Sequence, residues 1–218
     1  MTSQSKSALL DGMTSQRDVA KKSKEEAIFT AALSAIKEKG FHKARMSDIA
    51  ARAGISYGLV YHYFMSKEEL FDALVNRWWE GLFALMSGIR KSPEPLREKL
   101  ARIIHYFLDT YHKEPELVTI FITEISRSTS NLTPDRLENF KTFMSSTEQV
   151  IQEGQDTGAL RTDFKARYLT YIFLGALETF VSTMVLADQQ LKGNAQKDRI
   201  AESILGVFLN GAKQQGMC

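Results

Sequence analysis

Cysteine, proline and strand-like patterns are all scarce in this sequence of 218 residues. The single cysteine is the last residue, Cys218, which excludes an intramolecular disulfide and any zinc site built on several thiolates. The four prolines, Pro93, Pro95, Pro115 and Pro134, lie outside the strongly periodic stretches, so they separate helices rather than interrupt them. No long alternation of β-branched and polar residues occurs, and no Asn-Gly pair joins two strand-like runs, so a β-sheet is not expected.

Motifs of catalysis, secretion and membrane insertion are also missing. We find no glycine-rich phosphate loop and no nucleophile elbow, so an enzyme or a cofactor is not indicated. The first twenty residues hold no apolar run of signal-peptide length, so we expect a cytoplasmic protein. Residues 168–187 are long enough to span a bilayer, but Glu178 lies in their middle, where a carboxylate is costly. We therefore expect no membrane partner, and a helix buried in a core or a subunit interface.

Apolar residues recur at three- and four-residue spacing, which predicts an all-α protein. Phe29, Ala32, Leu33 and Ile36 form one such stripe, and Gly40 closes it. We expect about nine helices, over residues 18–39, 47–53, 57–63, 67–90, 94–112, 115–125, 134–156, 165–189 and 197–214.

The charge is unevenly distributed, although the net charge is only +2. Residues 1–67 hold 11 Lys/Arg and 6 Asp/Glu, which gives them a net charge of +5. The remaining residues have a net charge of −3. A basic front on a mildly acidic body agrees with nucleic-acid binding but does not prove it.

The most informative segment is 46–64, MSDIAARAGISYGLVYHYF. A short helix that ends at Ala53 is followed by Gly54, where the chain turns and a positive φ costs least. Ser56 then caps a second short helix, in which Val60 and Phe64 point inward. This pattern predicts a helix-turn-helix whose second helix is free to enter the major groove of DNA.

The outward positions of that second helix hold Tyr57, Gly58, Tyr61, His62 and Tyr63. None of these residues carries a full positive charge. Such side chains suit hydrogen bonds to phosphates, stacking on sugars and contacts with thymine methyl groups. Arg45 and Lys67 flank the motif, and we expect each of them to supply positive charge to a phosphate.

Residues 24–80 resemble the DNA-binding domain of the TetR family of bacterial transcriptional regulators. The resemblance begins in the first helix with Ala27-Ile28-Phe29, Ala32, Ile36 and Gly40-Phe41. It continues through Asp48-Ile49-Ala50, Ala53-Gly54-Ile55-Ser56, Leu59-Val60-Tyr61-His62-Tyr63-Phe64, Ser66-Lys67 and Leu70. Beyond this third of the chain the agreement is mainly in length and helical rhythm.

The resemblance implies a role for each matching residue. Tyr57 and Gly58 match positions that face bases, whereas Tyr61, His62 and Lys67 match positions that contact phosphates. Two positions depart from the family: Arg45 stands where a capping Thr is usual, and Ser47 stands where a basic residue is frequent. The candidate DNA contacts are therefore Arg45, Ser47, Ser56, Tyr57, Gly58, Tyr61, His62, Tyr63 and Lys67.

The family likeness also implies a domain plan. We expect a flexible arm over residues 1–17, an N-terminal three-helix domain over 18–66 and a C-terminal helical domain for ligand binding and dimerisation over 67–218. The helices at 165–189 and 197–214 would pair with their copies in a homodimer. Two-fold symmetry would then present two recognition helices to a palindromic operator in double-stranded DNA.

The body is rich in Phe and Met, which can line an adaptable apolar cavity for a small apolar effector. The candidate pocket residues are Phe83, Met86, Phe107, Tyr111, Phe121, Ile122, Ile125, Phe140, Phe143, Met144, Tyr171, Leu174, Leu177, Glu178, Phe180 and Met184. The run from Gly175 to Leu186 also resembles the corresponding helix of acyl-CoA-responsive regulators of fatty-acid degradation. That resemblance implies a repressor released from DNA by an acyl-CoA or a fatty acid.

Two other functions stay open at this level. His105, Asp109 and His112 fall on one helical face, at a spacing that could hold a metal in a small helical enzyme or metal-binding protein. Alternatively, a regulator of this type could be controlled by a protein partner, with no small ligand. A body without a cavity would favour the partner-controlled regulator.

Overall fold

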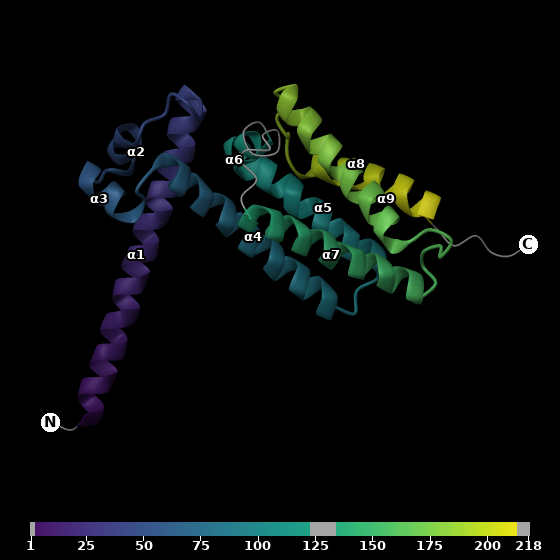
Figure 1. The fold of residues 1–218 in the computed structure, drawn as a ribbon, viewed down its shortest axis with the longest axis horizontal. Coiled ribbons are helices and arrows are strands. Elements are labelled where there is room, and N and C mark those ends of the chain that lie inside the picture. Colours follow the sequence, from purple (N-terminus) through teal and green to yellow (C-terminus); the bar gives the residue numbers. More distant parts are fainter. Residues whose placement is uncertain (1–2, 123–133, 213–218) are drawn as a thin grey trace, which may run out of the picture. The chain divides into compact units, whose positions relative to one another are not determined.

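The computed structural model describes residues 3–122 and 134–212, and describes side chains from residue 19 onward. Within these residues nine helices follow one another and no strand is present, which confirms the all-α prediction (Figure 1). The helices are α1 (Ser3–Lys39), α2 (Met46–Ala53), α3 (Tyr57–Tyr63), α4 (Lys67–Lys91), α5 (Leu96–Lys113), α6 (Pro115–Ile120), α7 (Pro134–Asp156), α8 (Ala166–Leu186) and α9 (Asn194–Ala212).

The first helix is longer than expected, because α1 begins at Ser3 rather than at residue 18. Residues 3–17 are therefore helical, where the sequence predicted a flexible arm over 1–17. These residues contain no proline, and a helix grows by one hydrogen bond per residue once it is nucleated. Their Ser, Gln and Thr content predicted a flexible arm, but a polar composition does not prevent a helical backbone.

The chain divides into two compact units, residues 1–74 and 75–218, so the division falls inside α4 rather than before it. The first unit contains α1 to α3 and the first turns of α4. Its core is built from Ile28, Ile49, Val60 and Leu70, each of which is almost fully buried. The unit extends beyond the predicted end at residue 66 because Phe71 is also buried in it, with its ring centroid 5.5 Å from that of Phe41.

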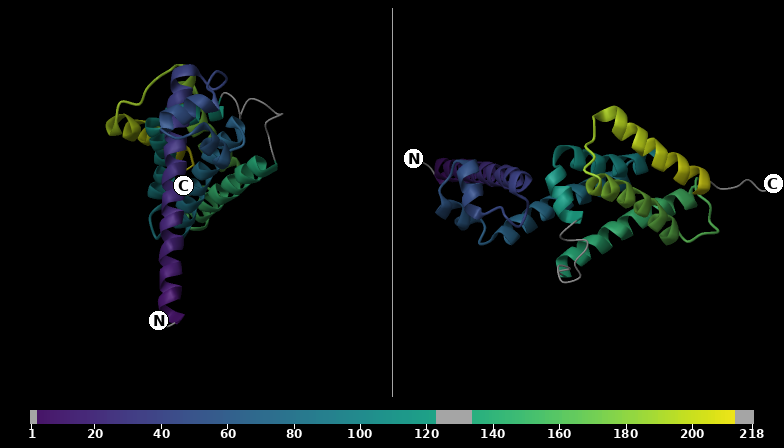
Figure 2. Two further views of the ribbon diagram at one scale, coloured as in Figure 1. Left: turned by 90° about the vertical axis from the view of Figure 1, so that its left-hand side faces the viewer. Right: turned by 90° about the horizontal axis from the view of Figure 1, so that it is seen from above.

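The second unit contains the rest of α4 together with α5 to α9, shown from two further directions in Figure 2. Within it α5 packs against α9 and α7 packs against α8. Leu82, Ile103, Leu108, Val150 and Phe173 are fully buried at its centre. This bundle follows from the apolar stripes at helical spacing, because each helix buries one stripe against its neighbours.

Helix α8 is the exception to that one-stripe pattern. It is the one helix among the described residues that is long and apolar enough to cross a membrane by length and composition, yet it is only 39% buried. Tyr168, Tyr171, Ile172 and Leu186 of α8 are exposed, and Val207 of α9 is 80% exposed. The second unit on its own therefore leaves an apolar face of these two helices uncovered.

Candidate nucleic-acid interface and apolar cavity

The turn between α2 and α3 has the geometry that the sequence predicted. Gly54 has a φ of 65°, and the N–H of Ile55 donates to the carbonyl of Ala50 at 3.2 Å. The hydroxyl of Ser56 then accepts from the N–H of Leu59 at 3.2 Å and caps α3. This left-handed glycine and the cap fix the direction in which α3 leaves α2.

One side of α3 is anchored in the core and the other side faces solvent. Val60 is fully buried, and the Phe64 ring lies 5.6 Å from that of Phe29. On the outer side Tyr57 is 54% exposed, and Gly58 and His62 are also exposed. A helix-turn-helix with a free outer face can insert that face into a DNA groove.

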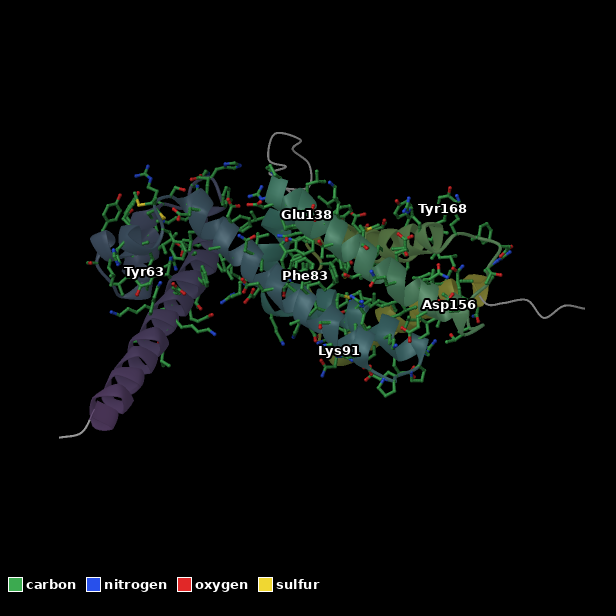
Figure 3. The ribbon with its side chains drawn as sticks, turned by 60° about the horizontal axis from the view of Figure 1, so that its bottom comes forward. Tyr63, Phe83, Lys91, Glu138, Asp156 and Tyr168 are labelled. Atoms are coloured by element: carbon green, nitrogen blue, oxygen red, sulfur yellow. The ribbon has the colours of Figure 1, made fainter. Side chains whose placement is uncertain are left out.

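Two tyrosines of this outer face form a pair. The rings of Tyr57 and Tyr61 lie 4.7 Å apart, and a hydrogen bond with Tyr57 raises the pKa of Tyr61. The Tyr61 hydroxyl therefore remains neutral at physiological pH. Tyr63, labelled in Figure 3, is half-buried at the end of α3.

The first turn of α2 is capped by Asp48, a role that was not predicted from the sequence. The Asp48 carboxylate accepts from the backbone N–H of Arg45 at 3.0 Å and from the Lys39 ammonium at 2.7 Å. The Lys39 hydrogen bond, and after it the Arg45 N–H, lower the pKa of Asp48. Asp48 lies three residues after the N-cap, a capping-box position that was visible in the sequence. Arg45 itself supplies no side-chain cap, and like Ser47 it is exposed.

Lys67 makes contacts inside the protein that compete with its predicted phosphate contact. Its ammonium donates to the carbonyls of Phe41, His42 and Ala44 at 2.6, 3.4 and 3.3 Å. The ammonium also lies 4.5 Å from the centre of the Phe41 ring. An ammonium has three N–H donors, so these carbonyls match its full capacity.

A cavity of about 100 Å³ lies in the second unit. Its walls come from α4, α5, the α6 region and α8, and they are mostly apolar. The lining residues are Val75, Trp78, Phe107, Thr110, Leu117, Val118, Phe121, Ile122, Glu178, Val181 and Ser182.

Of the predicted pocket residues, the structure brings together Phe107, Phe121, Ile122 and Glu178. The others, except Ile125, lie elsewhere in the described residues. Phe83, labelled in Figure 3, stacks on Trp79 instead, with ring centroids 5.6 Å apart. The buried core holds Met86, Tyr111, Phe143, Leu174, Leu177 and Met184, and Met144 is half-buried. Phe140, Tyr171 and Phe180 are exposed, and Ile125 lies outside the described residues.

Most of the cavity wall was not predicted from the sequence. The missed residues are Val75, Trp78, Thr110, Leu117, Val118, Val181 and Ser182. Each of these lies three or four residues from another lining residue of the same helix or of the turn that directly follows it, so one known lining position would have indicated its neighbours. Which side of each helix faces the cavity depends on tertiary packing, which the sequence periodicity does not give.

The residues considered for a metal site have other partners. Asp109 pairs with the buried ammonium of Lys197, and the His112 Nδ1 lies 3.1 Å from the Leu191 carbonyl. His105 lies 3.8 Å from Asp198. Within the described residues no group of three His, Cys, Asp or Glu side chains is arranged to hold a metal. This helical face instead connects α5 to α9 and the segment before it.

Fold and sites together define a helix-turn-helix DNA-binding protein with a second, cavity-bearing helical domain. Models of known protein families match both the DNA-binding part and the second domain of the chain. Residues 28–74 match the model of bacterial regulatory proteins of the tetR family, and residues 83–207 match that of the YsiA-like protein C-terminal region. The chain therefore belongs to the TetR family of transcriptional regulators, with a C-terminal domain of the YsiA-like type.

Individual relatives agree with this assignment. The chain is 25% identical to the fatty acid metabolism regulator protein of Bacillus subtilis over 191 residues, which is 88% of this chain and 96% of the relative. The structure of the FadR regulator from Bacillus subtilis with stearoyl-CoA matches at a TM-score of 0.71 and 24% identity, over 85% of this chain and 98% of that one. FadR from Bacillus halodurans matches at a TM-score of 0.72 and 22% identity, over 88% and 97%. The named relatives are transcriptional regulators.

Proposed function

We propose that this protein is a homodimeric repressor that is released from a palindromic operator when a long-chain acyl thioester enters the cavity of its second unit. The observation that carries the proposal is the apolar cavity, whose walls include residues of α4, the helix that also begins in the DNA-binding unit. A ligand that enters this cavity would therefore contact α4 directly, and through α4 it could affect the DNA-binding unit.

The DNA contacts come from the outer face of α3 and its surroundings. We propose that Tyr57 and Gly58 face bases and that Tyr61, His62 and Tyr63 contact the sugar-phosphate backbone. Arg45, Ser47 and Ser56 would add phosphate contacts at the start of α2 and α3. Lys67 stays a candidate for a phosphate contact, in competition with its bonds to the carbonyls after α1.

The homodimer would form through the uncovered apolar face of α8 and α9. Ile172 is 61% exposed and Val207 is 80% exposed, and large exposed apolar side chains gathered on neighbouring helices mark interaction surfaces. Covering this face with a second copy also accounts for the apolar composition of α8 without a membrane. The relatives are transcriptional regulators, so we propose that this protein also acts as a regulator in the cytoplasm, and not as an enzyme.

The effector class follows from the cavity and from the relatives. The walls suit a hydrocarbon chain, and the related structure from Bacillus subtilis is a complex with stearoyl-CoA. A regulator controlled only by a protein partner would not need such a cavity.

The size of the cavity suggests how release would work. An engineered cavity of about 150 Å³ accommodates benzene, so about 100 Å³ is too small for a long acyl chain. Binding would therefore have to move the lining helices, including α4 at Val75 and Trp78. Because packed helices shift as rigid elements, the ligand would favour a conformation other than the one that binds DNA.

Tryptophan fluorescence tests the proposal, because Trp78 lies in the cavity wall. Stearoyl-CoA, added below its micelle-forming concentration, should produce a saturable fluorescence change. The Trp78→Phe variant keeps Trp79, which does not line the cavity, and should lose most of that change. An absence of binding by calorimetry as well as by fluorescence, for acyl-CoA esters of every length, would contradict the proposal and favour control by a partner protein.

A further inference from the structure

Three hydrogen bonds form a closed ring between α4 and α5 beside the cavity. The hydroxyl of Tyr106 donates to the backbone carbonyl of Trp78 at 2.7 Å. The indole Nε1 of Trp78 donates to the Thr110 hydroxyl at 3.1 Å, and that hydroxyl donates to the Tyr106 carbonyl at 2.8 Å. Trp78 and Thr110 line the cavity, whereas Tyr106 does not. The Tyr106 hydroxyl therefore holds a residue of the cavity wall in place without being part of that wall.

Gly81 lets the Tyr106 side chain come this close to α4. A Cβ added at Gly81 would lie 2.5 Å from the Tyr106 hydroxyl oxygen, a distance at which one of the two groups has to move. The ring atom next to the hydroxyl, Cζ, would lie 3.5 Å away, which is ordinary van der Waals contact. A Gly81→Ala substitution would thus displace the hydroxyl but not the ring.

Tyr106 is suited to keep this bond across the physiological pH range. Its side chain is half-buried, and its ring centroid lies 5.9 Å from that of Trp78. Burial, and after it the charge of Glu114, raises the pKa of Tyr106 to about 12. The hydroxyl therefore remains a neutral donor, and the bond depends on the position of α4 rather than on pH.

We infer that Tyr106 and Gly81 form a latch that holds α4 in the narrow-cavity conformation and thereby sets how much effector is needed for release. This inference rests on the proposed function, because the cavity has to widen before a long acyl chain fits. Widening moves Trp78, and its carbonyl cannot move away from α5 without losing the Tyr106 bond. Apparent affinity is reduced by the fraction of molecules that can bind. A weaker latch would raise that fraction and tighten effector binding, although neither latch residue lines the cavity.

Tyr106→Phe tests the latch by removing its hydroxyl and keeping its ring. The net free energy of one hydrogen bond corresponds to about a fivefold change in an equilibrium constant. Calorimetry with stearoyl-CoA, added below its micelle-forming concentration, should therefore show about fivefold tighter binding than the wild type. Tyr111→Phe is the matched control on α5, because the Tyr111 hydroxyl donates to the Gln189 carbonyl, also at 2.7 Å, and not to α4. This control should lose similar stability in thermal unfolding but bind stearoyl-CoA as the wild type does.

Gly81→Ala tests the latch from the other helix. It should tighten stearoyl-CoA binding about as much as Tyr106→Phe does, because its Cβ displaces the same hydroxyl. Added to Tyr106→Phe it should have no further effect, since the hydroxyl is then absent and the ring is not displaced. Gly88→Ala is the control on α4, because its Cβ would lie 3.7 Å from Nη2 of Arg102, in ordinary contact. Its affinity for stearoyl-CoA should equal that of the wild type.

The outcomes separate the latch from the proposed function. Wild-type affinity in both Tyr106→Phe and Gly81→Ala, with the thioester still bound, would overturn the inference and leave the proposed function intact. Additive effects of the two substitutions would also overturn it, because they would show that the two residues do not act on one bond. If the wild type binds no acyl thioester, the proposed effector class is wrong and the inference is overturned with it. Thermal unfolding verifies that each measured affinity comes from folded protein.

Discussion

The ammonium nitrogen of Lys67 lies 2.6 Å from the carbonyl oxygen of Phe41, in the turn that follows α1. This bond joins the first residue of α4 to the segment that leads into α2. Together with two longer bonds to His42 and Ala44 it fixes where α4 leaves the DNA-binding unit. The same nitrogen was expected to contact a DNA phosphate, and the two roles predict different consequences of mutation.

Lys67→Met tests whether the lysine stabilises the unit. Losing its bonds to the carbonyls should lower the free energy of unfolding by about 1–3 kcal/mol, the range for hydrogen bonds of charged groups. Lys43→Met is the matched control, because Lys43 is an exposed lysine in the turn that carries the accepting carbonyls. The stability of this variant should equal that of the wild type. A variant at position 67 that unfolds like the wild type but loses about one unit of salt dependence in DNA binding would instead show a pure phosphate contact.

Gly54→Ala tests the backbone of the turn. At a φ of 65° a side chain costs roughly 1–2 kcal/mol, and nothing lies within 4 Å of the added Cβ, so strain in the backbone is the whole effect. Gly58→Ala is the control, because Gly58 also has open space around it but is helical. Urea unfolding should show a loss of stability for the first variant and none for the second. Equal stabilities would contradict the left-handed turn.

Asp48 predicts a pH dependence of stability. Since hydrogen bonds to Lys39 and the Arg45 N–H lower its pKa in the folded protein, the folded state gains stability above the ordinary carboxyl pKa of about 4. That gain is lost as the pH falls through the lowered value. Asp48→Asn should therefore be less stable than the wild type at pH 7, and the difference should shrink in acid. A stability difference that does not change with pH would contradict the lowered pKa of Asp48. Glu138→Gln, at an exposed position on α7, is the control and should show no such pH-dependent difference.

Val207→Arg tests the proposed dimer. Val207 is 80% exposed on α9, so a charge there should leave the fold of one chain intact and prevent a second copy from covering the face. Sedimentation should show a monomer, and operator affinity should fall at least a hundredfold because two reading heads no longer bind together. Glu138→Arg is the control, because it places the same side chain at an exposed position on α7, outside the proposed interface. A dimer of normal affinity would place the interface elsewhere.

Local patterns were sufficient to predict much of the DNA-binding unit. Gly54 and the Ser56 cap are set by neighbouring residues, so their roles could be inferred without the tertiary fold. The sequence could not show that Lys67 bonds to carbonyls some 25 residues earlier, because that contact depends on how the start of α4 packs on the turn after α1. It was also insufficient for the start of α1, where polar residues continue the helix back to Ser3.

The cavity could be predicted only in part, for the same reason. Phe107 and Phe121 were selected because they are large and apolar, a property they share with core residues such as Phe143. Trp78 and Val181 were missed because nothing local separates a cavity wall from a core. Glu178 was found because a carboxylate in an apolar helix is conspicuous in any context.

The most direct test of the account is the release of DNA by the effector. A labelled genomic fragment that the protein selects from the DNA of its source should bind the dimer, and fluorescence anisotropy should report its release as stearoyl-CoA is added. Val181→Trp fills the cavity and should bind the same fragment but fail to release it. We predict release from the wild type alone. DNA that stays bound at saturating thioester, or that is released equally from the filled variant, would contradict control through this cavity.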